Sequence, residues 1–252
     1  MIHYVKQGKI PPKRHIVFKE GDMLIREEVF GTFGFSGRYS LLYRLNPPSK
    51  INKSVSWKTY EIQEWKVETR HHHLKTWELK QVKDPFTERI PLLFNDDVII
   101  SFASLSSNTK NENVFYRNGE YDEVYFIHQG KGKLLSMFGY VEVNEGDYVV
   151  IPRGTIYNWD LPEGTKLLII EAKQVEIPKV YRNDYGQLLE GSFYYHRDIR
   201  IPILETYDKN GEYFIITRSL DGFHTVMVDY HPFDVIGWDG FLYPFAISAY
   251  DL

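Results

Sequence analysis

Residues 71–73 are three consecutive histidines, and their type and spacing could bind a metal ion. If this segment is a strand, His71 and His73 lie on one face, because side chains alternate along an extended chain. Two imidazoles on one face can hold a zinc or nickel ion. Apart from Glu68 and Glu78, no nearby carboxylate has a spacing that suits such a site. We therefore favour a structural role for the histidines, either as a polar strand end or in packing between aromatic neighbours such as Trp77.

A glycine-containing segment with a carboxylate ahead of it carries a second pattern. Gly146 is followed after five residues by Pro152 and then by Gly154, and two residues separate Gly154 from Tyr157. The arrangement resembles the two motifs of a cupin, a small jelly-roll barrel that holds a metal with histidines and one glutamate. A cupin has histidine where Tyr157 stands here, and its glutamate corresponds to Glu123.

The remaining ligand positions of the cupin pattern hold residue types that do not suit iron. The two histidines of the first motif should fall at Tyr116 and Asn118, or one residue later at Arg117 and Gly119. Two neutral imidazoles and one carboxylate bind Fe(II) and leave open positions, whereas phenol, amide and guanidinium groups do not replace imidazole. The sequence therefore predicts a barrel that keeps the turns of the scaffold but binds no metal of its own.

Turn signals between residues 119 and 172 predict a series of short strands, which is typical of a jelly roll or barrel. Aromatic residues make up 16% of the chain, and these favour half-buried β-surfaces. An Asp-Gly pair at 221–222 separates two apolar runs and predicts a hairpin of residues 212–218 and 223–230. We expect an all-β fold with a cupin-like jelly-roll barrel, whose clearest strands are residues 123–128, 133–138, 140–143, 148–151 and 166–171.

The composition narrows the classes of function. Hydrophobic residues make up 43% and charged residues 25% of the 252, as in a folded soluble protein. The formal net charge of −4 gives no overall basic field for a nucleic acid. Cysteine is absent, which excludes disulfides and thiolate metal sites and fits a cytoplasmic protein. The N-terminus lacks the apolar stretch of a signal peptide, and no segment is apolar for long enough to span a membrane.

Three segments together resemble the homogentisate 1,2-dioxygenase family in its prokaryotic branch. They occur in the order of that family across essentially the whole chain, and they are more specific than one glycine-rich turn. The segments are residues 33–37 (FGFSG), 116–123 (YRNGEYDE) and 231–240 (HPFDVIGWDG).

The resemblance implies a protein with two cupin-like halves. The N-terminal half would be structural and metal-free, in agreement with the residues at the ligand positions. The C-terminal half would carry two histidines and a glutamate on Fe(II), and it would open the ring of homogentisate with O2 in tyrosine and phenylalanine breakdown. Those ligands are expected beyond Leu252, so this chain would be an inactive N-terminal two-thirds that binds no cofactor specifically.

The expected division of the chain follows from the same resemblance. Residues 1–172 should form the N-terminal cupin-like jelly roll, and residues 173–252 should form a connecting region and the opening strands of the C-terminal half. The implied partners are a small aromatic acid substrate, O2 and further copies of the chain, in a homo-oligomer that is a trimer or hexamer. Arg14 and His15 could touch a neighbouring subunit.

One catalytic position of the family falls inside this chain. Some members carry, in the turn near Trp238, a histidine proposed as an acid–base or substrate-contacting group, and Asp239 stands at that position here. A carboxylate could also accept a proton. The alternative interpretation is that Asp239 precedes Gly240 because this pair suits a turn.

Three further polar residues have both functional and structural interpretations. His231 and Asp234 could line a pocket at the junction with the C-terminal half. We favour a structural role, in which His231 caps a strand and Asp234 hydrogen-bonds the backbone of its own turn. His128 lies in a predicted barrel strand, where a lone histidine is more often a partly buried polar residue than a ligand.

Rival functions belong to other classes. The chain could be a complete metal-free cupin-like protein that binds a small molecule or serves as structure, and such a protein should expose no large apolar surface at its C-terminal end. A cupin isomerase would need polar groups or histidines in the barrel, and the missing ligands argue against it. The sequence holds no P-loop, serine-hydrolase elbow or dinucleotide fingerprint, which removes most nucleotide and serine-hydrolase functions.

Overall fold

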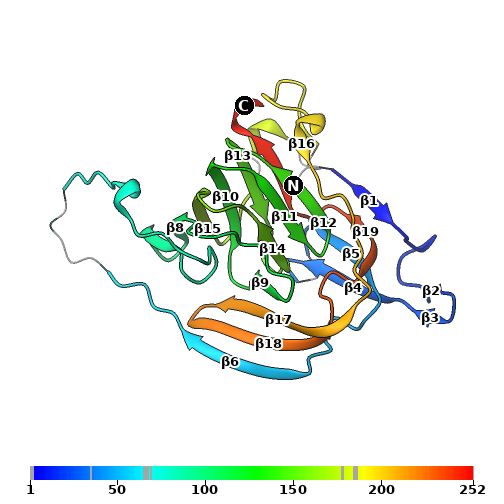
Figure 1. The fold of residues 1–252 in the computed structure, drawn as a ribbon. Coiled ribbons are helices and arrows are strands. Elements are labelled where there is room, and N and C mark those ends of the chain that lie inside the picture. The colour runs from blue at the N-terminus through cyan, green and yellow to red at the C-terminus, as the bar shows by residue number, and fades with distance from the viewer. Residues whose placement is uncertain are drawn as a thin grey trace.

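The computed structural model describes residues 3–34, 36–64, 68, 70–176, 179–183 and 187–251. Phe35 of the first family-like segment and Leu252 lie outside the described residues. Regular structure in the described part is nearly all β-strand, which confirms the predicted all-β fold (Figure 1). The helical elements are single 3-10 turns, namely η1 (Thr76–Glu78), η2 (Lys179–Tyr181), η3 (His196–Asp198) and η4 (Ala249–Asp251).

A seven-stranded antiparallel sheet forms one wall of the barrel. Its order is β16–β20–β13–β10–β15–β8–β7. The register places Glu123 of β10 opposite Ile151 of β13 and Glu171 of β15. The strands are β7 (Ile90–Phe94), β8 (Val98–Ser104), β10 (Asp122–Gln129), β13 (Asp147–Ile151), β15 (Lys166–Ala172), β16 (Ile199–Arg200) and β20 (Phe245–Ser248).

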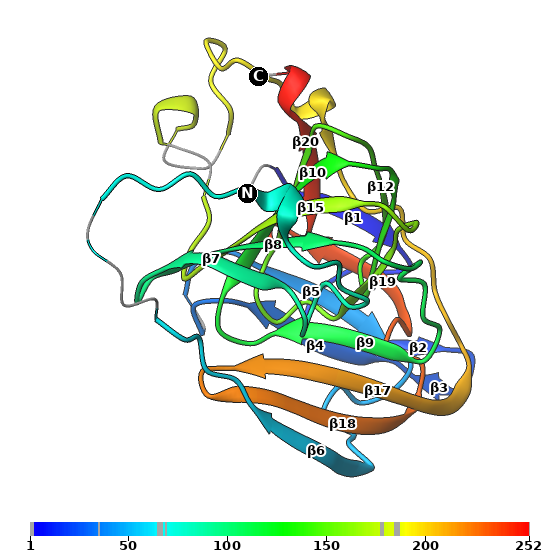
Figure 2. The ribbon, with the colours of Figure 1, turned by 60° about the vertical axis from the view of Figure 1, so that its left-hand side comes forward.

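A second seven-stranded sheet forms the opposite wall, in the order β12–β11–β14–β9–β17–β18–β6. Strand β14 pairs with β9 through Tyr157 and Tyr116, so the register sets two cupin ligand positions side by side. Strands β17, β18 and β6 lie together along one side of the molecule (Figure 2). The strands are β6 (Lys53–Thr59), β9 (Val114–Asn118), β11 (Gly132–Ser136), β12 (Gly139–Val143), β14 (Tyr157–Asp160), β17 (Asn210–Ser219) and β18 (Gly222–Tyr230).

A four-stranded sheet packs beside the barrel in the order β1–β19–β5–β4. Its register places Asp239 of β19 between Lys6 of β1 and Leu41 of β5. The strands are β1 (Val5–Gly8), β4 (Arg26–Gly31), β5 (Tyr39–Arg44) and β19 (Val235–Gly240), and a small hairpin of β2 (Lys19–Glu20) and β3 (Met23–Leu24) lies outside them.

Period-two burial explains why these segments form strands around one core. Along β15 and β13 buried and half-buried residues alternate strictly, so that Leu167, Ile169, Val149 and Ile151 all point into the barrel. Removing such an alternating apolar face from water stabilises the sheet by roughly 25 cal/mol per Å². The predicted strands and the hairpin of β17 and β18 are therefore confirmed.

Strands on both sides of the expected boundary at residue 172 share the three large sheets. Strand β20 pairs with β13, β17 pairs with β9, and β19 pairs with β5. The described part of 173–252 thus packs with 1–172 in the same sheets. The division into an N-terminal half and the opening strands of a second half stays a prediction.

Candidate functional site

Arg89 lies in the centre of the barrel among residues that occupy cupin ligand positions. Its Nη1 donates a hydrogen bond of 2.9 Å to Oε1 of Glu123, and its Nη2 donates one of 3.0 Å to the hydroxyl of Tyr116. Its Nε donates a third, of 3.0 Å, to the backbone carbonyl of Phe86. The guanidinium is buried and therefore joins two of the predicted ligand positions directly.

Tyr157 connects the third ligand position to the same centre. Its hydroxyl donates a hydrogen bond of 2.6 Å to Oε2 of Glu123 and shares another, of 2.8 Å, with the hydroxyl of Tyr125. The rings of Tyr157 and Tyr116 meet edge to face, with 5.5 Å between their centroids. The turns of the cupin pattern thus bring three ligand positions together, as the sequence predicted, but around a guanidinium.

A second carboxylate and a second arginine complete this cluster. Oε2 of Glu171 lies 3.7 Å from Nη1 of Arg89, and Oε1 of Glu171 lies 3.8 Å from Nε of Arg218. Nδ2 of Asn118 donates a hydrogen bond of 2.9 Å to Oε1 of Glu171. Two buried carboxylates therefore face two buried arginines, which avoids the large cost of an unpaired buried charge.

The pKa shifts in the cluster follow from this burial. Burial opposes the charge of Arg89, but the surrounding acidic groups outweigh it and raise the pKa of Arg89 well above its ordinary value. Burial and the charge of Glu123 raise the pKa of Tyr116 and Tyr157 well above the usual range for phenols. At neutral pH the cluster therefore contains neutral phenols and a guanidinium that stays protonated.

This donor set does not fit the Fe(II) that a cupin with its full set of histidines and glutamate would hold. A phenol that remains protonated is a poor ligand, and the positive charge of Arg89 stands among the ligand positions. Across the described part of the chain no group of three or more His, Asp or Glu side chains could hold a metal ion. No step at a metal is therefore assigned to these residues.

Asp239, the predicted acid–base residue, lies in strand β19 and is 3% exposed. The hydroxyl of Tyr4 donates a hydrogen bond of 2.8 Å to its Oδ2, and the guanidinium of Arg14 forms an ion pair with the same oxygen. Arg14 also donates a hydrogen bond of 3.0 Å to the hydroxyl of Tyr39. The sequence did not indicate this pairing, because Arg14 and Asp239 lie 225 residues apart.

Oδ1 of Asp239 is buried and has no hydrogen-bond partner in the described residues. This oxygen is the one still able to accept a proton or a hydrogen bond. The turn interpretation was wrong, because Asp239 and Gly240 belong to β19 and pair with Leu41 and Ser40 of β5. Gly240 has φ +150°, and a Cβ there would lie 2.4 Å from Cα of Ser40, so close strand approach explains this glycine.

His231 and Asp234 have structural partners, although the expected partner of Asp234 was wrong. Nδ1 of His231 accepts a hydrogen bond of 3.1 Å from the backbone N–H of Phe233. The carboxylate of Asp234 does not bond its own turn. It accepts a hydrogen bond of 2.7 Å from Nη1 of Arg44 and one of 2.8 Å from the backbone N–H of Asn46. These bonds connect the turn to the end of β5.

His231 makes the protein sensitive to acid. Its ring stacks on Tyr207 with 4.4 Å between centroids, and burial, helped by Lys209, lowers its pKa to about 4. The unfolded chain takes up this proton near pH 6.5 and the folded chain only near pH 4. We expect about 2 kcal/mol of stability to be present above pH 6.5 and lost as the pH falls to 4.

Chemical denaturation at several pH values tests this expectation. His231→Asn keeps an acceptor for the N–H of Phe233 but cannot be protonated, so its stability should depend less on pH between 4 and 6.5. The matched control is His128→Asn, because His128 is exposed. Equal pH dependence of the native protein and His231→Asn would show that His231 does not cause the acid sensitivity.

The other predicted polar candidates lie apart from these clusters. His71, His72 and His73 are exposed in an irregular segment, so the expected strand is wrong and no shared strand face exists there. The ring of His73 packs edge to face on Trp77 at 5.9 Å, in agreement with the favoured aromatic packing. His128 is exposed at the end of β10, rather than partly buried as expected.

Arg14 and His15 are occupied by groups of this chain. Arg14 pairs with Asp239, and Nδ1 of His15 lies 2.5 Å from Oε1 of Glu27. Their expected contact with a neighbouring subunit stays a prediction.

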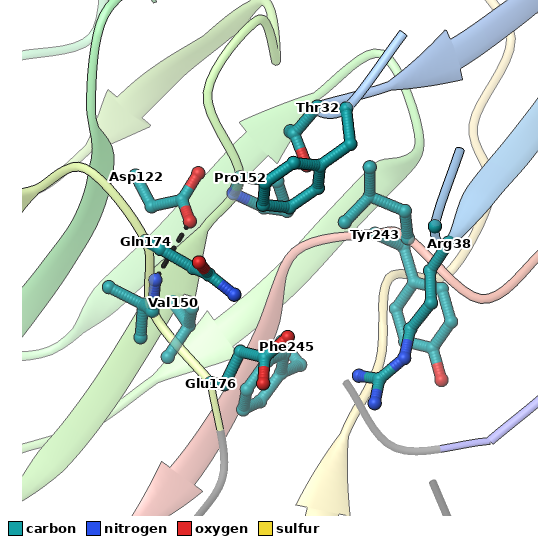
Figure 3. Close-up of a pocket in the computed structure, with 13 residues that line it drawn as sticks. Thr32, Arg38, Asp122, Val150, Pro152, Gln174, Glu176, Tyr243 and Phe245 are labelled. Carbon is teal, nitrogen blue, oxygen red and sulfur yellow. Dashed lines mark hydrogen bonds between the residues drawn. The ribbon is translucent and has the colours of Figure 1, made fainter. Parts of the chain in front are cut away.

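A cavity of about 140 Å³ lies where the loop after β4 meets strand β13 and the segment that precedes β20 (Figure 3). Arg38, Asp122 and Glu176 are its charged lining residues. Its other lining residues are mostly apolar, namely Phe33, Val150, Pro152, Val175, Leu242, Tyr243 and Phe245, with Thr32, Gly37 and Gln174.

Neither Arg89 nor Arg38 was predicted from the sequence as a functional residue. Arg38 directly follows the segment at residues 33–37, so its place beside a family-like segment could have drawn attention to it. No local signal marks Arg89, because its partners Glu123 and Tyr116 come from distant strands.

The fold and the barrel centre define a cupin-like protein in which a guanidinium stands among the metal-ligand positions. Residues 36–252 match the family described as "Homogentisate 1,2-dioxygenase N-terminal". The chain therefore belongs to this family, which confirms the resemblance inferred from its sequence segments.

Similar proteins include a "Putative dioxygenase" from Saccharolobus solfataricus, which is 54% identical over 253 residues. That match covers 100% of this chain and 65% of the relative. The homogentisate 1,2-dioxygenase of Homo sapiens is 28% identical over 145 residues, covering 56% of this chain and 32% of the human protein. That of Caenorhabditis elegans is 24% identical over 155 residues, covering 61% and 34%. The chain thus spans less than two thirds of the length of these relatives.

Among solved structures, a cupin-2 domain protein from Shewanella frigidimarina shares 17% identity with this chain and gives a TM-score of 0.30. The match covers 35% of this chain and 83% of that protein. Within the described residues, no helix is both long enough and apolar enough to cross a bilayer.

Proposed function

We propose that this chain is the metal-free N-terminal part of a homogentisate 1,2-dioxygenase, an Fe(II)-dependent extradiol-type enzyme of tyrosine and phenylalanine catabolism. The family match and the 54% identical dioxygenase relative support this assignment. The observation that carries it is the barrel centre, where Arg89 pairs with Glu123 among the cupin ligand positions. A barrel of this kind supplies a scaffold and needs its catalytic metal elsewhere in the protein.

Fe(II), where bound by the parent protein, would hold the substrate hydroxyl and O2 in its open coordination positions. The described residues contribute no ligand set for it. Asp239 is the residue of this chain that we propose as a proton acceptor, through its unpartnered Oδ1. Tyr4 and Arg14 hold the other oxygen and so fix the direction in which Oδ1 points.

The partners proposed for the parent protein are a small aromatic acid, O2 and further copies of the chain. A homo-trimer or hexamer in the cytoplasm is the expected assembly, without nucleic acid or membrane. The formal net charge of −4 supports the exclusion of nucleic acid.

Oxygen uptake with homogentisate tests the proposal when the 252-residue chain is compared with the product of its complete gene. We expect the 252-residue chain to hold no stoichiometric iron and to show no uptake, and the complete product to show both. Intact mass identifies each sample. Uptake by the 252-residue chain with stoichiometric iron would contradict the proposal, and so would a complete gene product without uptake.

Asp239→Asn in that complete protein should lower the turnover number for oxygen uptake by about 10²-fold or more, because a general base typically contributes 10²- to 10⁴-fold. Asn keeps the shape of the side chain but removes the charge that pairs with Arg14, so the thermal midpoint should fall, and a cooperative thermal melt must show that the variant is folded. Glu27→Gln is the matched control, since it also removes a carboxylate in the same four-stranded sheet. Unchanged turnover in Asp239→Asn would leave Asp239 with a structural role only.

A second candidate function is that of a metal-free small-molecule binder. The observation that favours it is the cavity beside Arg38, which lies outside the barrel centre. Binding without oxygen uptake by the complete gene product would favour this function over the dioxygenase.

A further inference from the structure

The guanidinium of Arg38 is the charged feature that makes this cavity distinctive. Arg38 is half-buried, and it has no hydrogen-bond acceptor in the part of the chain that the structure describes. Burial and the nearby charge of Arg182 lower the pKa of Arg38, while Glu176 acts in the opposite direction. Glu176 already forms an ion pair with Arg182, so among the described residues the donors of the Arg38 guanidinium are not matched by acceptors.

The remainder of the cavity is suited to a planar apolar group. The rings of Phe33, Tyr243 and Phe245 and the ring of Pro152 line it. In Figure 3 Arg38 and Tyr243 lie on one side of the cavity, and Pro152 and Val150 lie across from them. Cavities on the order of 150 Å³ lined by apolar side chains hold one benzene-sized ring, and this cavity measures about 140 Å³.

Asp122 sets the direction in which an anion would bind. Its Oδ1 accepts a hydrogen bond of 2.9 Å from the backbone N–H of Arg153, and its Oδ2 accepts one of 2.9 Å from the backbone N–H of Val175. Figure 3 places this carboxylate on the side of the cavity away from Arg38. An anionic group would therefore be repelled at the Asp122 end and attracted at the Arg38 end.

We propose that this cavity is a binding site for a small aryl carboxylate. The carboxylate pairs with the guanidinium of Arg38, which offers the planar pair of donors that carboxylates accept. The aromatic ring of the ligand lies among Phe33, Pro152 and Phe245. This inference goes beyond the proposed dioxygenase function, because the site lies on this chain and needs no iron.

Isothermal titration of the iron-free 252-residue chain tests the site with three probes. Phenylacetate carries the ring and the charge, phenylacetamide carries the ring without the charge, and acetate carries the charge without the ring. We expect saturable binding of phenylacetate at one site per chain, and at least tenfold weaker binding of the other two. A charge-assisted hydrogen-bond pair is sufficient for a difference of this size.

Two variants of Arg38 assign the charge effect to this residue. Arg38→Met should weaken phenylacetate binding at least tenfold without changing that of phenylacetamide, and Arg38→Lys should have an intermediate effect. Arg26→Met is the matched control, because Arg26 is exposed at the other end of β4. Thermal melts confirm that each variant is folded.

Three results would overturn the site. They are no saturable phenylacetate binding to the native chain, equal affinity for phenylacetate and phenylacetamide, and unchanged phenylacetate affinity in folded Arg38→Met. None of them bears on oxygen uptake by the complete gene product, so the two proposals can fail separately.

Discussion

Replacement of Arg89 by methionine is expected to lower the free energy of unfolding by about 3–5 kcal/mol. The substitution leaves Glu123 and Glu171 buried without the guanidinium that lies between them. Tyr116 also loses its hydrogen bond from Nη2 of Arg89. Denaturation by urea at pH 7 measures the effect, and a midpoint shift with an unchanged slope identifies it as a loss of stability.

Two further variants separate charge from packing. Arg89→Met combined with Glu123→Gln should recover part of the loss, because one of the unpaired carboxylates is removed. Arg197→Met is the control for a general effect of losing one arginine, since the side chain of Arg197 is 82% exposed. A loss below 1 kcal/mol in Arg89→Met, or no recovery in the double variant, would refute a central role for this ion pair.

The triple variant Arg89→Ala, Tyr116→His and Tyr157→His is expected to gain a metal site that the native chain lacks. It removes the guanidinium and places two imidazoles beside Glu123, the set that suits borderline divalent metals. The register already pairs position 116 with position 157. The hydroxyl of Tyr157 hydrogen-bonds Glu123, and the hydroxyl of Tyr116 hydrogen-bonds Arg89, the partner of Glu123. One Co(II) or Zn(II) ion per chain should bind.

Cobalt absorption spectra and thermal melts measure this gain. At a Zn(II) concentration 100 times its Kd, the triple variant should be stabilised by about 2.7 kcal/mol, and the native chain should not respond. Adding Glu123→Gln to the triple variant should abolish most of the binding. If the variant folds, as judged by circular dichroism, and still binds no metal at one site per chain, the guanidinium does not occupy a metal position.

The barrel could be predicted from the sequence, because the features that specify its turns and strands lie close together along the chain. Turns such as Gly146 and Gly154 adopt positive φ angles that glycine tolerates, and the strands between them alternate with period two. The same local evidence identified Glu123, Tyr116 and Tyr157 as cupin ligand positions without a metal set. These positions do meet in space, because β10, β9 and β14 carry them into one centre.

Partners from distant segments were decided by the tertiary structure alone. Arg89, Arg38 and the Arg14–Asp239 pair depend on which strands become neighbours, and pairing between segments up to 225 residues apart leaves no local pattern in either one. Asp234 is a further case, since its carboxylate accepts a hydrogen bond from Arg44 of β5 instead of the expected bond to its own turn. Periodicity and turn residues thus specify the scaffold, whereas buried charges find their partners only when the sheets pack and exclude water.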